Sequence, residues 1–176
     1  MNPTQNQLLQ SIHVICKVIA QIPCFHLYEE YVAQKFSNTE PEIAFRAMTH
    51  DAALDSALIS LRCFNEFFNS TRQKDDIRAS DFPNVSIQPF LSPDEATAIH
   101  KYVAHVTITR SDIVTKPWFL DDMVMRGLQH GVMFLSTIET SFPPITESNW
   151  SELRGVRDAA RLVIGKIANR RERNTA

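Results

Sequence analysis

Apolar side chains recur every three or four residues along most of this chain, and the pattern is clearest between His50 and Asn69. At about 100° per residue, one side of this stretch is apolar and the opposite side is polar. This periodicity predicts an amphipathic helix with one face in a protein core. The apolar side consists of Ala53, Leu54, Ala57, Leu61, Phe64 and Phe68. We therefore predict that this stretch is the central helix of the molecule.

The polar side of the same stretch carries both acidic and basic residues. It consists of Asp51, Asp55, Arg62, Asn65, Glu66 and Asn69. Such a stripe is usually a solvent-exposed helix face with weak ion pairs. The sharper alternative is that Asp55 holds the Arg62 guanidinium in place to meet a phosphate or a partner carboxylate, for which its planar fork is suited. Asn65 belongs to the same candidate binding stripe.

The same periodicity predicts further helices on the N-terminal side. Thr4 can cap a first helix, which Pro23 then breaks. A short second helix is predicted over residues 25–36. From residue 42 to residue 69 the pattern continues without an internal glycine or proline. This part is therefore either one long helix or two helices with a bend between them.

A long polar segment leads into the C-terminal half of the chain. Residues 70–91 are punctuated by prolines, and at about twenty residues the segment is longer than most loops in compact domains. Such a loop is either packed and functional or partly disordered. Ser92 then opens a capping box, with Pro93 at the first helical position and Glu95 at the third. A helix is predicted to start there.

Two more helices are predicted beyond this one. The first, over residues 117–140, has apolar residues such as Met133 widely spread around its wheel, as expected of a helix buried between others. The second has a predicted cap at Ser148 or Asn149 and ends in a basic tail, residues 169–176, which we expect to fray. These patterns predict an all-α fold, a single-domain bundle of five to seven helices that spans the whole chain.

The composition fits this fold and narrows the function. The chain has 176 residues, of which 44% are hydrophobic and 22% charged, as in ordinary globular domains. Its net charge of −2, with both signs interspersed, gives no overall attraction for nucleic acid or an anionic membrane. The apolar run 12–22 is too short and too polar to span a bilayer. Because the three cysteines lack paired or zinc-like spacing and no signal segment opens the chain, we expect a cytoplasmic protein without a membrane span.

The common catalytic motifs are missing from the sequence. It has no phosphate-binding glycine loop, HExxH, paired CxxC or Gly-x-Ser-x-Gly, so no cofactor is expected. His13 and His26 lie among apolar residues and are interpreted as core or boundary groups. His130 follows Arg126 by four positions, which is typical of an ordinary exposed pair on one helix face.

The helix that starts after Ser92 brings together His100, Lys101 and His105. Lys101 lies one turn before His105, and this pair can bind an anion or transfer protons, because histidine titrates near neutral pH. A helix-end histidine bonded to a carbonyl is the simpler interpretation. A metal site is not expected, since His100 and His105 lie about 140° apart on the wheel.

The segment AIHKYVAHVT follows a helix with the pattern ALISLRCFNEFF and precedes a tryptophan-containing helix. Over residues 50–135 this arrangement resembles the HEPN-type helical bundles of bacterial defence and toxin systems. The resemblance implies a helical bundle that forms dimers. Ribonucleases of that type use an Arg-x4-6-His motif at the dimer interface, without a metal. Here His100 stands where the arginine would be, and His105 matches the histidine.

Two hypotheses for the function follow. The first is a non-catalytic interaction domain that binds a protein partner, such as a toxin or another defence component, or a second copy of itself. The second is a metal-independent ribonuclease that uses His105, with Arg62 or Lys101 steadying the phosphate. The candidate catalytic residues are therefore His105 and Arg62, and the candidate binding residues are Asp55, Asn65, His100 and Lys101.

Overall fold

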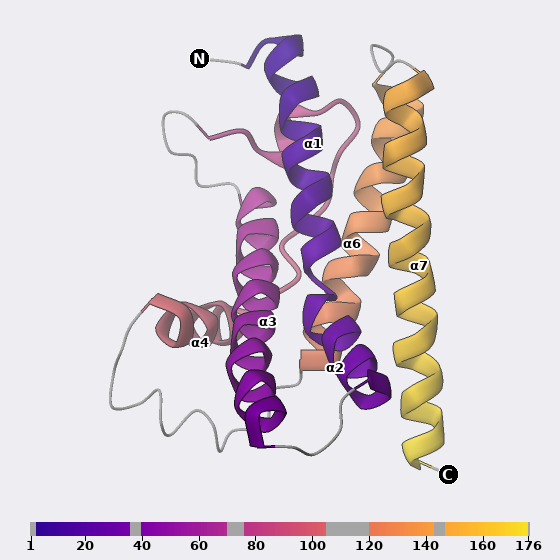
Figure 1. The fold of residues 1–176 in the computed structure, drawn as a ribbon. Helices are drawn as coiled ribbons and strands as arrows, with labels where there is room; N and C mark the ends of the chain where they lie inside the picture. The colour runs from indigo at the N-terminus through magenta and orange to yellow at the C-terminus, as the bar shows by residue number, and fades with distance from the viewer. Residues whose placement is uncertain (1–2, 36–39, 70–75, 105–119, 143–146, 176) are drawn as a thin grey trace.

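The computed structural model describes residues 3–35, 40–69, 76–104, 120–142 and 147–175, and these ranges form a bundle of helices (Figure 1). This part of the chain contains six α-helices and no strand, which confirms the all-α prediction. The helices are α1 (Gln5–Gln21), α2 (Cys24–Lys35), α3 (Glu40–Phe67), α4 (Pro93–Ala104), α6 (Leu120–Ser141) and α7 (Glu147–Thr175). A short 3-10 helix, η1 (Ala79–Asp81), lies between α3 and α4 in the chain.

The helix α1 begins and ends where the sequence predicts. Thr4 caps it with a full capping box, in which the Thr4 backbone N–H donates to Gln7 Oε1 at 2.7 Å. Pro23 separates α1 from α2. No single helix within the described ranges is long and apolar enough to cross a membrane, although the bent pair of α1 and α2 together reaches that length and composition.

The helix α3 is the centre of the bundle. It is one continuous helix, so the alternative of two helices with a bend is ruled out. Helices α1, α2, α4 and α6 all pack against it, and α4 lies across it in Figure 1. The predicted apolar face is confirmed, because Leu54 is partly buried and the other members are buried: Ala53, Ala57, Leu61, Phe64 and Phe68.

Two glycines let α6 approach its neighbours closely. A Cβ atom on Gly127 would lie 2.8 Å from Leu61 Cδ2 of α3, and one on Gly131 would lie 3.0 Å from Ile19 Cγ2 of α1. The prediction that α6 is buried between other helices is only partly right. Met133 lies on its outer side and is 52% exposed.

Phenylalanine rings from α3, α6 and the segment between α3 and α4 form the middle of the core. Phe134 of α6 packs edge-on against Phe67 and Phe82, with ring centroids 5.2 and 5.3 Å apart. Residues 76–91, the described part of the predicted 70–91 loop, contribute four buried side chains: Ala79, Phe82, Phe90 and Leu91. Of the two alternatives for the loop, packing is therefore confirmed for this part.

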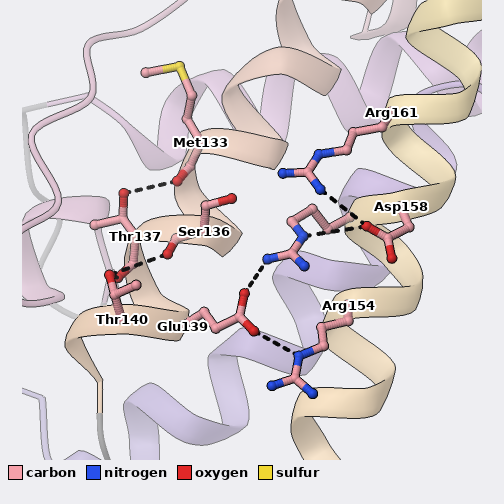
Figure 2. Close-up of polar contacts among 9 residues, drawn as sticks. Met133, Ser136, Thr137, Glu139, Thr140, Arg154, Asp158 and Arg161 are labelled. Atoms are coloured by element: carbon pink, nitrogen blue, oxygen red, sulfur yellow. Dashed lines mark hydrogen bonds and ion pairs between the residues drawn. The ribbon is translucent and has the colours of Figure 1, made fainter.

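A single carboxylate, Glu139, joins α6 to α7 through two arginines (Figure 2). One of its oxygens accepts a hydrogen bond from Arg154 Nε at 2.7 Å, and the other pairs with Arg157. The Arg154 bond first, and then the Arg157 bond, hold the pKa of Glu139 below its usual range. The ionised carboxylate is thus the form that stabilises this contact.

The helix α7 is longer than predicted at both ends. It includes Ser148 and Asn149, so the predicted cap at these residues is wrong. Its other end continues through Thr175, so the tail that we expected to fray is helical. Arg171 Nη1 lies 2.6 Å from Asp122 Oδ1 in the first turn of α6, and this ion pair holds the end of α7 against the bundle.

Candidate functional site

Asn65 attaches the segment before α4 to the middle of the bundle. Its side chain is buried, and its Oδ1 accepts hydrogen bonds from the backbone N–H groups of Phe90 and Leu91, both at 2.8 Å. We call this arrangement the Asn65 clamp. Asn65 was predicted to lie on an exposed binding stripe, and that prediction is wrong. Residues 90 and 91 cover it, so its amide is used inside the protein.

Arg126 of α6 holds the same segment. Its Nη1 donates to the Phe90 carbonyl at 2.7 Å, and its Nη2 pairs with Glu95. His130 lies one turn further along α6, where its Nδ1 is 2.8 Å from the Arg126 carbonyl oxygen and its ring lies against Phe90. The interpretation of Arg126 and His130 as an ordinary exposed pair is therefore wrong.

Glu95 links this arrangement to the start of α4. Its carboxylate accepts the Ser92 N–H at 2.8 Å, while the Glu95 N–H donates to Ser92 Oγ at 3.2 Å, so the predicted capping box is confirmed. Burial alone would raise the pKa of Glu95, but the bonds from Arg126 and Ser92 outweigh burial and lower it. Glu95 therefore caps α4 and anchors it to α6 as a carboxylate.

The clamp places α4 beside the polar stripe of α3. Arg62 Nη1 lies 2.6 Å from His100 Nδ1, which accepts the hydrogen bond, and Arg62 Nε donates to Glu66 Oε1 at 2.8 Å. Glu66 of α3 therefore holds Arg62, while the role predicted for Asp55 stays a prediction. The contact with His100 joins two predicted site residues that lie on different helices.

Asp55, Lys101 and His105 complete the predicted set of site residues. Asp55 is half-buried on α3, and Lys101 is exposed in the last turn of α4. His105, one of the two predicted catalytic residues, lies outside the described residues. Of the predicted site residues, the structure thus brings Arg62 and His100 into contact. Asn65 instead supports the fold through its buried hydrogen bonds.

A cleft of about 730 Å³ opens beside Arg62, between α1, α3 and residues 76–78. Its charges balance, because Arg62 pairs with Glu66 and Arg78 pairs with Asp76. Cys63 also lines the cleft, but burial raises the pKa of its thiol, with Glu66 adding to the effect. A reactive cysteine needs a lowered pKa, so the cleft does not favour thiol chemistry.

A second polar cluster, which the sequence did not predict, lies at the other end of the bundle. His26 of α2 is bonded through Nε2 to Asp121 Oδ1 of α6 at 2.7 Å, and its side chain is only 10% exposed. The two residues are 95 positions apart. Two sequence signals lay at this place: the apolar surroundings of His26, and the acidic pair Asp121 and Asp122, which falls in the first turn of α6.

No protein-family model, curated protein or solved structure matches this chain. The HEPN-type resemblance rests on the residues quoted for it and stays a prediction. Among the residues that the structure describes, no three His, Cys, Asp or Glu side chains come together as metal ligands.

The Asn65 clamp predicts a large loss of stability when its acceptor is removed. Asn65→Ala, and also the similarly sized Asn65→Leu, should lower the free energy of unfolding by about 2–4 kcal/mol, because two buried N–H groups lose their acceptor. Urea unfolding followed by circular dichroism measures this. The matched control Asn169→Ala, on an exposed position of α7, should stay within about 0.5 kcal/mol of the wild type. If Asn65→Leu is as stable as the wild type, the clamp does not support the fold.

Proposed function

We propose that this protein is a non-catalytic interaction domain that pairs with a second copy of itself through the outer face of α3. The observation that carries the proposal is an apolar stripe on that face. Phe45, Met48 and Ile59 are 53%, 76% and 45% exposed, although they belong to the most central helix. On an ideal helix their directions lie within about 60° of one another.

The stripe is long enough for a helix–helix contact. From Phe45 to Ile59 it extends about 21 Å along the helix axis. Ala52 and Cys63 are exposed on the same face, and Val14 of α1, 61% exposed, lines the adjoining cleft with Cys63. Exposed apolar surface gathered in this way is typical of an interaction site.

A second copy of the chain is the partner that fits best. A net charge of −2 gives little repulsion between two copies. The face carries few charged groups along the stripe itself, so two α3 helices can bury it against each other. Fully burying a large apolar side chain contributes about 1.5–3 kcal/mol, and the half-exposed residues here still have part of that gain available. The HEPN-type resemblance also implies a dimer.

This proposal predicts a concentration-dependent dimer that a single charge disrupts. Met48→Asp should raise the dissociation constant at least about tenfold, because it buries a carboxylate in the apolar contact. Sedimentation velocity over the micromolar range measures it. Leu162→Asp is the matched control, because Leu162 is 60% exposed but lies on α7, away from this face. A wild type that stays monomeric throughout, or a Met48→Asp protein that dimerises as the wild type does, would refute the proposal.

The contact between Arg62 and His100 supports a second candidate function, metal-independent cleavage of RNA. A guanidinium beside an imidazole is a suitable group to receive a phosphate, and α4 leads directly toward His105 in the chain. In this alternative His105 transfers the proton, while Arg62 or Lys101 stabilises the charge on the phosphate.

RNA incubated with the purified protein in a chelator tests this alternative. Cleavage by the wild type should fall about a hundredfold or more in His105→Ala, since that is the usual contribution of a general acid or base. His13→Ala is the control, because His13 lies on α1 and pairs with Glu152 at the surface. If the wild type leaves RNA intact, or if His105→Ala cleaves as fast as the wild type, the catalytic alternative is wrong.

A further inference from the structure

A groove separates α2 from the C-terminal half of α7, which run beside each other in Figure 1. Most contacts of α2 are with α3 on its other side. Across the groove, Lys166 Nζ and Glu30 Oε2 form an ion pair at 2.9 Å. This ion pair joins the two helices, and space remains around it.

This space consists of two adjoining cavities of about 440 and 260 Å³. Three residues line both, namely His26, Glu29 and Arg170. The larger cavity has an apolar wall made by Leu27, Val163 and Ile167, and the last two are buried. Its volume is typical of small-molecule sites, and polar and charged side chains line the rest of it.

Three cations of α7 lie along the larger cavity. Lys166, Arg170 and Arg173 are spaced so that they share one face of the helix, and all three line this space. Lys166 is neutralised by Glu30. Among the described residues, Arg170 has no hydrogen bond or ion pair, and Arg173 donates only to the Asn169 carbonyl. Two guanidinium groups beside one cavity are therefore available to an anion.

The acidic groups set where that anion can lie. Asp121 lines only the smaller cavity, where it holds His26. Glu29 lines both cavities, and its Oε1 is 3.8 Å from His50 Nε2 on α3. An anionic group therefore fits in the larger cavity, beside Arg170 and Arg173.

His26 forms a fixed wall between the two cavities. Its ring is nine-tenths buried, and Nδ1 has neither exposed surface nor a hydrogen-bond partner among the described residues. Because a carboxylate oxygen accepts, Nε2 donates to Asp121 Oδ1, and this hydrogen bond fixes the ring's orientation. The part of the groove wall that His26 makes is therefore built in advance, which lowers the entropy cost of binding.

We propose that the larger cavity binds a small amphiphilic anion, in which a carboxylate or phosphate meets Arg170 and Arg173 and an apolar body lies against Leu27, Val163 and Ile167. The negative charge of the ligand sets its orientation in the cavity, because guanidinium groups bind a carboxylate or a phosphate through paired hydrogen bonds. The apolar body supplies most of the buried surface. This site is independent of the dimer face on α3.

Isothermal titration calorimetry with four probes tests the site: octanoate, octyl phosphate, 1-octanol and inorganic phosphate. We expect octanoate and octyl phosphate to bind at least about tenfold more tightly than 1-octanol or inorganic phosphate. The comparison of octanoate with octyl phosphate decides which oxyanion the site prefers. If neither amphiphile binds, or if 1-octanol binds as tightly as both, the proposal is overturned.

Two arginine variants locate the binding. Arg170→Ala and Arg173→Ala should each weaken the tighter amphiphile about tenfold, because each removes a charge-assisted contact. Arg161→Ala is the matched control, since Arg161 is also exposed on α7 but pairs with Asp158, outside the groove. Circular dichroism should show that all three variants are folded. Unchanged affinity in the double variant Arg170→Ala/Arg173→Ala would place the ligand elsewhere and overturn the proposal.

Discussion

The amide oxygen of Asn65 is the constraint on which much of this fold depends. It accepts hydrogen bonds from two consecutive backbone N–H groups, those of Phe90 and Leu91, inside the core. Unpaired buried N–H groups are costly, so the segment before α4 is stable in its buried position only while this acceptor is present. Arg126 of α6 donates a hydrogen bond to the Phe90 carbonyl. The helices α3 and α6 and the segment before α4 therefore meet at Phe90.

The clamp also determines the surface that the protein presents. Because residues 90 and 91 are fixed to α3, the helix α4 starts beside the polar stripe and His100 reaches Arg62. The apolar stripe of Phe45, Met48 and Ile59 is left exposed on the outer face of α3. One helix thus has a core face, a polar contact with α4 and an outer face that can pair with a second copy.

The sequence predicted those features that depend on local pattern. Periodicity identified the buried face of α3, and short-range capping signals located the starts of α1 and α4, because Thr4 and Ser92 act within one helical turn. Asn65 could not be read in this way, since its hydrogen bonds reach 25 and 26 residues along the chain. The contacts of Arg62 with His100 and of His26 with Asp121 likewise depend on how helices pack, which no local spacing encodes.

Hydrogen–deuterium exchange of the Phe90 and Leu91 amides tests the clamp most directly, because exchange requires the two hydrogen bonds to open. We predict that both amides exchange as slowly as the amides in the middle of α3, although they lie outside any helix. Exchange as fast as that of exposed backbone would contradict the central place of Asn65 in this structure.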